Sequence, residues 1–278
     1  MHGISYAQDG VFLFIALQII ACAREIENIM GIIQSVRCLG MHLFATSLAG
    51  ALFLAGCLST GTAQLEEEAA YRNPDRFEAQ IQEFEAADAE AMPPEGAIVG
   101  LGSSSMRGWH GSIHEDLAPL TVIPRGFGGS TMYDALHYLD RVVFPYRPRA
   151  ILLYEGDNDI AFGIATEKYM ATFEALVEAV HEELPETRIY VLAIKPSISR
   201  WAIWPQMQEA NAALEAACEE HALLTYIDIA TPMLLDDGTP NPDIFLDDML
   251  HMSAKGYEVW TKVVRPVLLE AELEYETE

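Results

Sequence analysis

The chain has 278 residues, a hydrophobic fraction of 51%, and a formal net charge of −26 from 16 basic and 42 acidic residues. A chain of this length and apolar content can bury a sizeable core, which excludes a largely disordered protein. The acidic excess disfavours binding to nucleic acid and to anionic membrane faces, because like charges repel. We therefore expect a globular protein that does not bind nucleic acid.

The first 57 residues differ from the rest of the chain. Residues 43–56 are an apolar run of small and medium side chains, LFATSLAGALFLAG, which ends at Cys57. An apolar run followed by small residues is the pattern of a secretory signal. The ending Leu-Ala-Gly-Cys resembles a bacterial lipoprotein box, in which the cysteine is acylated. We expect residues 1–57 to be such a leader, with Met30 as an alternative start, and an uncleaved anchor or a chance apolar run as other interpretations.

The leader predicts export to the periplasmic face of a bacterial membrane, with the N-terminal lipid or signal as the membrane contact. A linker is expected over residues 58–72 and one domain over residues 73–278. The body of the chain keeps a single cysteine, Cys218, so it can form neither an internal disulfide nor a cysteine-based metal site.

The domain alternates short apolar runs with amphipathic stretches, which is typical of a parallel sheet covered by helices on both faces. A first helix is expected in 73–91, where Asn73 can cap and Pro74 fits the first turn. Strands are expected at 97–101, 120–123, 150–154, 189–193 and 224–228, and further helices near 131–143, 166–183, 206–221 and 254–273.

In an open sheet of this kind, ligands bind at the carboxyl ends of the strands. Four segments at such places carry polar or glycine-rich sequence. They are Gly102-Ser103-Ser104-Ser105, Arg125-Gly126-Phe127-Gly128-Gly129-Ser130-Thr131, Glu155-Gly156-Asp157-Asn158-Asp159, and Asp247-Asp248-Met249-Leu250-His251 before the last helix. Each segment alone also fits a structural role in a turn or a helix cap. Together at one end of a sheet, they predict a catalytic site.

Ester hydrolysis by serine needs a hydroxyl, a base, a carboxylate that orients the base, and donors for the oxyanion. A serine at a helix N-terminus has unpaired backbone N–H groups around it. Gly129 offers an unhindered amide, and the side chain of Asn158 offers an N–H donor. Asp248 precedes His251 by three residues, close enough in a turn to fix the tautomer of its ring.

The ordered segments GSSS, RGFGGST, GDND and DMLH resemble the four blocks of the SGNH hydrolases, also called the GDSL esterase/lipase family. The resemblance extends from about Phe77 to the last helix. It implies a flavodoxin-like three-layer α/β/α sandwich with a five-stranded parallel sheet, and a serine esterase that hydrolyses acyl esters through an acyl-enzyme without a cofactor. The roles it implies are nucleophile for Ser104, oxyanion donors for Gly129 and Asn158, base for His251, and its orienting partner for Asp248.

The chain departs from the family pattern at two places. The usual Gly-Asp-Ser-Leu is Gly-Ser-Ser-Ser, so Ser103 and Ser105 are rival nucleophiles, although the Gly-x-Ser register favours Ser104. The second block commonly opens with an asparagine where this chain has Pro124.

Two other functions are consistent with the same residues. One is a metal-dependent phosphoesterase that uses an oxygen-rich cluster of Asp157, Asp159, Asp247, Asp248 and His251. The other is an inactive, lipid-anchored binding module on a hydrolase scaffold. The expected partner is a small acyl-ester substrate. The sequence determines neither which ester this is nor the oligomeric state of the protein.

Several further side chains have both a structural and a functional interpretation. Trp201 and Trp204 either line an acyl or sugar pocket or pack at the sheet edge. Arg125 and Lys195 either meet a negative charge on the substrate or pair with carboxylates. A structural or surface role is expected for five further histidines, which are His110, His114, His137, His181 and His221.

Overall fold

The computed structural model describes residues 69–276. The predicted leader with Cys57, and the predicted linker up to residue 68, lie outside the described residues. Among the helices of residues 69–276, none has the length and apolar character needed to cross a membrane.

Five parallel strands form the central sheet, in the order β2-β1-β3-β4-β5. Their bounds are Ile98–Gly102 for β1, Val122–Gly126 for β2, Ala150–Tyr154 for β3, Arg188–Leu192 for β4 and Leu224–Ile227 for β5. The strand β3 has the predicted bounds, and the ends of the others move by no more than three residues. All residues of β1 and β3 are buried, which explains why both segments are continuous apolar runs. Pro124 lies in the edge strand β2, where the missing N–H is tolerated.

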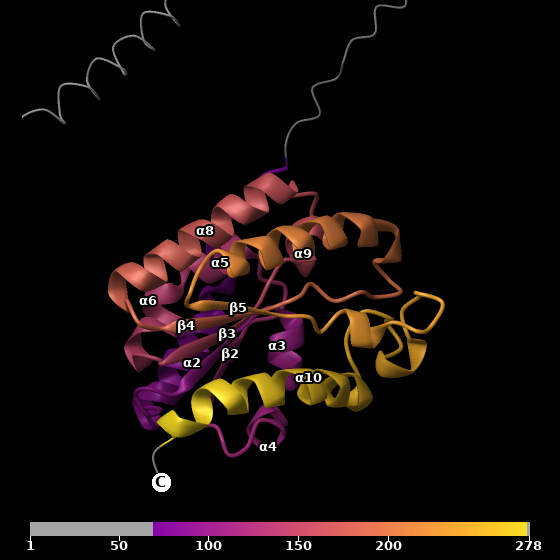
Figure 1. The fold of residues 1–278 in the computed structure, drawn as a ribbon. Coiled ribbons are helices and arrows are strands. Elements are labelled where there is room, and N and C mark those ends of the chain that lie inside the picture. The colour runs from indigo at the N-terminus through magenta and orange to yellow at the C-terminus, as the bar shows by residue number, and fades with distance from the viewer. Residues whose placement is uncertain (1–68, 277–278) are drawn as a thin grey trace, which may run out of the picture. The chain divides into compact units, whose positions relative to one another are not determined.

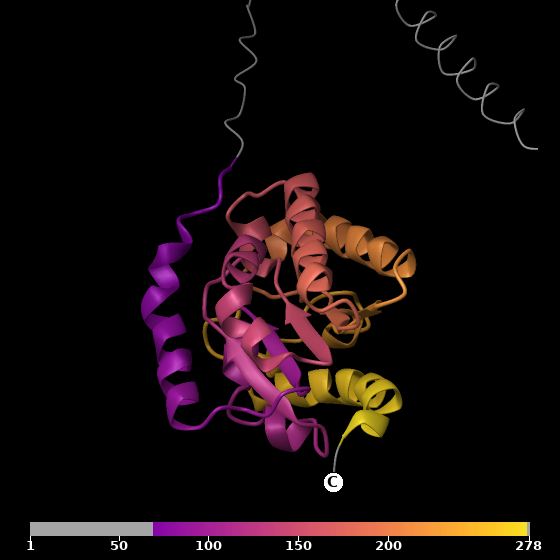
Figure 2. The same ribbon diagram turned by 90° about the vertical axis from the view of Figure 1, so that its left-hand side faces the viewer.

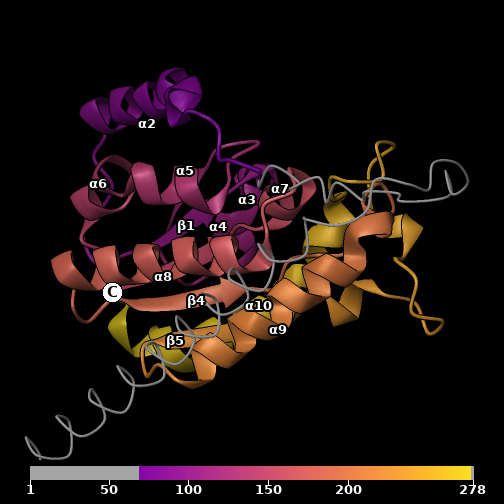
Figure 3. The ribbon, with the colours of Figure 1, turned by 90° about the horizontal axis from the view of Figure 1, so that it is seen from above.

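The helices form layers on the two faces of this sheet. The longer ones are α2 (Glu78–Glu90), α8 (Thr166–Glu183), α9 (Trp204–Glu219) and α10 (Ala254–Glu272). The shorter ones are α3 (Ser104–Trp109), α4 (Ile113–Asp116), α5 (Met132–His137), α6 (Leu139–Val142) and α7 (Asp157–Ala161). Figure 1 shows α5, α8 and α9 on one side of the sheet and α4 and α10 on the other. Figure 3 looks down on the first of these layers, with α5, α8 and α9 next to one another. The predicted three-layer α/β/α fold is confirmed.

Two predicted helices differ in detail from the observed ones. The stretch 131–143 is divided into α5 and α6 at Tyr138, whose hydroxyl donates to the carbonyl of Pro74 at 3.0 Å. The stretch 73–91 begins with a 3₁₀ turn, Pro74–Phe77, before α2, and Asn73 caps it as expected. Figure 2 shows α2 along one side of the domain, where Glu78 and Glu85 both pair with Arg141.

Short 3₁₀ turns connect or end several elements. They are Phe144–Tyr146, Trp201–Ile203, Thr231–Met233, Pro242–Ile244 and Leu273–Tyr275. The last of them ends the helix that was predicted to reach residue 273, so α10 proper stops at Glu272.

The strand order places a change of winding direction between β1 and β3. The chain moves from β1 outward to β2, and then crosses back to β3 on the other side of β1. In open α/β sheets, ligands bind at the carboxyl ends of the strands beside such a point. The segments after β1, β2 and β3 therefore meet where a site is expected.

Candidate active site

The first strand delivers Ser104 to the carboxyl edge of the sheet through a turn that requires glycine. Gly102 has a φ of +154°, and a Cβ there would lie 2.2 Å from the carbonyl oxygen of Tyr154. The next residues begin α3, with Ser104 as its first residue. Ser103 and Ser105 are each 1% exposed, whereas Ser104 is half-buried and lines a cavity. Of the three consecutive serines, Ser104 is therefore the one that a substrate can reach.

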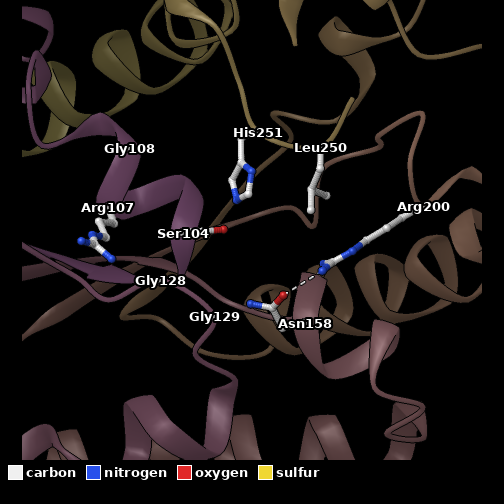
Figure 4. Close-up of a pocket in the computed structure, with 9 residues that line it drawn as sticks. All are labelled: Ser104, Arg107, Gly108, Gly128, Gly129, Asn158, Arg200, Leu250 and His251. Atoms are coloured by element: carbon white, nitrogen blue, oxygen red, sulfur yellow. Dashed lines mark hydrogen bonds between the residues drawn. The ribbon is translucent and has the colours of Figure 1, made fainter. Parts of the chain in front are cut away.

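The cavity beside Ser104 has a volume of about 590 Å³ and collects residues from all four predicted segments (Figure 4). Its lining is Ser104, Arg107, Gly108, Gly128, Gly129, Asn158, Arg200, Leu250 and His251. Four of the five predicted site residues are thus brought together around one space, and the fifth, Asp248, contacts one of them.

His251 is oriented by Asp248, as the three-residue spacing predicted. Nδ1 of the histidine lies 2.6 Å from Oδ2 of Asp248. The other carboxylate oxygen accepts the backbone N–H groups of Leu250 and His251, at 3.0 and 2.9 Å. The bond to His251 and these two amides lower the pKa of Asp248 to about 2. In the neutral ring, a charged carboxylate beside Nδ1 favours the tautomer with the proton on Nδ1, so that Nε2 is the acceptor.

The imidazole points toward Ser104 in Figure 4. Within residues 69–276, neither the Ser104 hydroxyl nor Nε2 of His251 has a hydrogen-bond partner. Catalytic hydrogen bonds are often long in a free enzyme and tighten when substrate binds. Both atoms are thus free to act on a ligand in the cavity.

The opposite side of the cavity presents N–H donors. Gly129 has a φ of +91° and open space where a Cβ would stand, so its amide borders the cavity without hindrance. The side chain of Asn158 donates through Nδ2 to the carbonyl of Ser130 at 2.8 Å, and its Oδ1 accepts from Arg200 at 3.0 Å. These two bonds fix which end of the amide carries the N–H groups. The second hydrogen of Nδ2 is not used by either bond.

Buried carboxyl groups hold the loop that carries Gly129. Oε1 of Glu155 accepts from the hydroxyl of Ser130 at 2.5 Å. Asp159 accepts the backbone N–H of Met132 at 3.0 Å and the hydroxyl of Tyr71 at 3.1 Å. Burial raises the pKa of Glu155 well above its usual range and that of Asp159 to about 7. The segment after β3 thus anchors the segment after β2, and Tyr71, at the end of the predicted linker, takes part.

Asp157 belongs to a buried cluster with two cations. Lys195 donates to it at 2.6 Å, and Arg200 donates to its other carboxylate oxygen at 2.5 Å. Burial alone would raise the pKa of Asp157, but the two cations together lower it. Because Arg200 also binds Asn158, this cluster supports the donor side of the cavity.

Four of the five side chains proposed for a metal site form other contacts, and two of these four, Asp248 and His251, contact each other. Asp157 is occupied by Lys195 and Arg200, and Asp159 by two N–H or O–H donors. In the described part of the chain, no group of three or more histidine, cysteine or acidic side chains is arranged to hold a metal ion. The observed geometry therefore does not favour the metal-dependent alternative.

The other residues with two interpretations take structural positions. Arg125 pairs with Asp88 at 2.5 Å and Lys195 pairs with Asp157. Trp201 and Trp204 stack on each other, with ring centroids 5.9 Å apart, and neither lines the cavity. None of the five other histidines in residues 69–276 lines it either.

His110 shows the structural role in detail. Its Nε2 accepts the backbone N–H of Gly126 at 3.0 Å. Burial, with the nearby charges of Arg125 and Arg107, lowers the pKa of His110 to about 4. The ring is therefore neutral and acts as an acceptor that holds the end of β2.

Sequence reasoning did not assign three residues that contribute to the site. Arg107 follows Ser104 by three positions on the short helix α3 and lines the same cavity. Arg200 was noted only as part of the family resemblance, and nothing in the sequence links it to Asn158. Glu155 stands in a predicted segment, but its contact with Ser130 depends on tertiary structure.

The chain is similar to known proteins in sequence and in fold. Residues 95–259 match the model of the GDSL-like lipase/acylhydrolase family. Platelet-activating factor acetylhydrolase IB subunit alpha1 of Homo sapiens is 26% identical over 188 residues, which are 66% of this chain and 79% of that protein.

Two solved structures have a similar fold. A GDSL-like lipase from Bacteroides thetaiotaomicron has a TM-score of 0.59 at 18% identity, and the match covers 69% of this chain and 98% of the other. An acetyl xylan esterase from Geobacillus stearothermophilus has a TM-score of 0.50 at 15% identity, with 66% and 99% covered. These similarities support the SGNH hydrolase fold, and the family match covers more than half of the residues. The chain therefore belongs to the GDSL-like lipase/acylhydrolase family.

Proposed function

We propose that this protein is a serine esterase that hydrolyses small carboxylic esters through an acyl-enzyme, with Ser104 as nucleophile. One observation carries the proposal: Ser104 and His251 line the same cavity. The two atoms that would exchange a proton, Oγ of Ser104 and Nε2 of His251, each have no hydrogen-bond partner in residues 69–276. Membership of an acylhydrolase family supplies the reaction class.

In the first half of the reaction, Oγ of Ser104 attacks the carbonyl carbon of the ester while Nε2 of His251 takes its proton. Asp248, charged and 2.6 Å from Nδ1, stabilises the imidazolium that results. The negative charge on the former carbonyl oxygen is met by the backbone N–H groups of Ser104 and Gly129 and by the free Nδ2 hydrogen of Asn158. The C–O bond to the alcohol then breaks, and the imidazolium returns the proton to the leaving alcohol.

In the second half, the acyl group is removed by water. The same imidazole takes a proton from water, whose oxygen attacks the acyl carbon under the same three donors. Collapse of the tetrahedral intermediate frees the carboxylic acid and returns the proton to the hydroxyl of Ser104. No cofactor enters this sequence of steps.

The names of two similar proteins suggest a small acyl group. The human relative is named as an acetylhydrolase and the Geobacillus stearothermophilus protein as an acetyl xylan esterase. We therefore choose acetyl esters as the first substrates to test.

The test combines turnover of 4-nitrophenyl acetate with labelling by a fluorophosphonate, which reacts with an activated serine. We expect the intact protein to be labelled at Ser104 and to hydrolyse the ester, and Ser104→Ala and His251→Ala to lose turnover. Ser105→Ala is the matched control, because it removes a neighbouring hydroxyl that is buried and does not line the cavity. Full turnover in Ser104→Ala would contradict the role given to Ser104.

The same assay separates the two other functions. A metal-dependent phosphoesterase would lose activity with a chelator and would hydrolyse 4-nitrophenyl phosphate. A binding module would neither turn over the ester nor react with the probe. We expect ester turnover that a chelator leaves unchanged.

We also propose that the mature protein is exported and lipid-anchored at Cys57, which rests on the apolar run 43–56 and the residues Leu54-Ala55-Gly56 before the cysteine. Expression in a bacterial host followed by mass spectrometry of the mature N-terminus tests this. Acylated Cys57 is the expected result, and a Cys57→Ala variant should stay unacylated. An N-terminus upstream of residue 57 in the wild-type protein would contradict the proposal.

A further inference from the structure

We infer that the cavity selects esters that carry a negative charge on the alcohol part, and that Arg107 is the residue that reads this charge. The inference rests on the proposed esterase function and adds a substrate class to it. The ligand chemistry is that of an acyl ester with a carboxylate or a similar anion near the ester bond.

The first observation is the charge of the cavity compared with that of the chain. The whole sequence has 16 basic and 42 acidic residues. Nevertheless, the nine lining residues include two arginines, Arg107 and Arg200, and no carboxylate. A cleft lined by one sign of charge concentrates ligands of the opposite sign.

The second observation concerns the free guanidinium of Arg107. Arg107 is exposed, and within residues 69–276 its side chain has no hydrogen bond and no ion pair. Other arginines of the domain pair with carboxylates, for example Arg141 with Glu78 and Glu85, or Arg188 with Glu272. An arginine left unpaired at the cavity of a strongly acidic protein has all five N–H donors available for a ligand.

Its position suits a group next to the reacting ester. Arg107 follows Ser104 by three residues on α3, and both residues line the same cavity. A Cβ built at Gly128 would lie 3.4 Å from Nη1 of Arg107. The guanidinium therefore lies beside the loop that carries Gly128 and Gly129. Figure 4 shows Arg107 and Arg200 on opposite sides of Ser104.

The charges behind the lining do not cancel this effect. Arg200 and Lys195 share one carboxylate, Asp157, so that cluster keeps one net positive charge. Asp248 adds one negative charge behind His251. The free guanidinium of Arg107 is therefore the unpaired positive charge that a substrate anion would meet. Arg200 donates to Asp157 and Asn158 instead, and so holds the donor side of the cavity in place.

The experiment compares two acetates that differ in charge, 4-acetoxybenzoate and its neutral methyl ester. The value of kcat/KM is measured with both acetates for the wild-type protein and for each variant. Each variant is then compared with the wild-type protein on the same acetate, so that the different chemical reactivity of the two acetates cancels. We expect Arg107→Gln to lower kcat/KM for 4-acetoxybenzoate about tenfold, the size of one charge-assisted hydrogen bond. The value of kcat/KM for the methyl ester should stay unchanged in Arg107→Gln. Arg107→Lys should keep most of the wild-type preference for the charged acetate over the neutral one.

Arg147→Gln is the matched control. Arg147 is also exposed and forms no ion pair in the described part of the chain, but it does not line the cavity. Arg147→Gln should leave kcat/KM unchanged for both substrates. Added salt should reduce the difference between the wild-type protein and Arg107→Gln, because it screens a partly exposed pair.

The two proposals fail in different ways. Hydrolysis of the neutral methyl ester reports the esterase function itself, and its absence together with a lack of fluorophosphonate labelling would reject that function. If the neutral ester is hydrolysed but Arg107→Gln lowers kcat/KM equally for both substrates, or for neither, the selectivity for anions is refuted while the esterase function stands.

Discussion

The side-chain amide of Asn158 offers the sharpest test of the donor side of the cavity. Its Nδ2 donates to Ser130 at 2.8 Å and its Oδ1 accepts from Arg200 at 3.0 Å, so both ends of the amide are fixed before substrate arrives. One Nδ2 hydrogen is left for the oxyanion. We expect Asn158→Ala to lower kcat by roughly 100- to 1000-fold, or about 2.7–4 kcal/mol of transition-state stabilisation. KM should change little, because the donor is used most fully when the oxygen becomes negative.

The assay is steady-state turnover of 4-nitrophenyl acetate, together with thermal unfolding of each variant. Asn158→Asp is a second variant of similar size, which keeps an oxygen for Arg200 but lacks the N–H donor. Asn73→Ala is the control, since Asn73 caps a 3₁₀ turn and does not line the cavity. A loss in kcat below about tenfold in Asn158→Ala, with the fold intact, would refute the assignment of this amide to the oxyanion.

Two further predictions concern the carboxylates. Asp248→Asn should lower kcat by roughly 10²- to 10⁴-fold, because a neutral amide no longer fixes the tautomer of His251. Rates of 4-nitrophenyl acetate turnover check this prediction, and an unchanged rate would contradict the role given to Asp248. Asp159 has a folded-state pKa raised to about 7, so the folded protein holds a proton that the unfolded chain releases, and stability falls as pH rises from about 4 to 7. Asp159→Asn keeps the acceptor oxygen for Met132 and Tyr71 and should remove this decline, about 1.4 kcal/mol per pH unit in that window. Urea unfolding of the wild-type protein and of Asp159→Asn between pH 5 and pH 8 measures this decline in stability. Parallel curves of unfolding free energy against pH for the two proteins would contradict the prediction.

The sequence was sufficient to predict the fold where periodicity is strong. The run 150–154 is apolar at every position and is buried throughout β3. The helix 166–183 has the expected bounds, because its apolar residues recur on one face over 18 residues. The helices α3, α4 and α7 have six, four and five residues, so none of them is long enough to show a period.

The candidate site was predictable as far as it depends on strand ends and local turns. Asp248 and His251 are three residues apart, and their contact forms within one turn. By contrast, the choice among three consecutive serines depends on how α3 meets the sheet. The contact between Arg200 and Asn158 joins residues 42 positions apart. Such contacts follow from the packed structure and leave no local signal.

The two sides of the cavity are held by different forces. The donor side depends on buried contacts between distant segments, such as Glu155 with Ser130, in which each partner is shielded from water. The side chains of Asp248 and His251 are 48% and 40% exposed, so the hydrogen bond between them adds little to global stability despite its short distance.

This difference suits the chemistry that each side would perform. Donors to an oxyanion act through fixed positions, since their contribution falls if they must reorganise during the reaction. In the proposed mechanism the base exchanges protons with Ser104, with the leaving alcohol and with water, and an exposed ring can follow these partners. The costly buried carboxyl groups are therefore placed where rigidity is needed, and the solvent-exposed pair is placed where the proton must come and go.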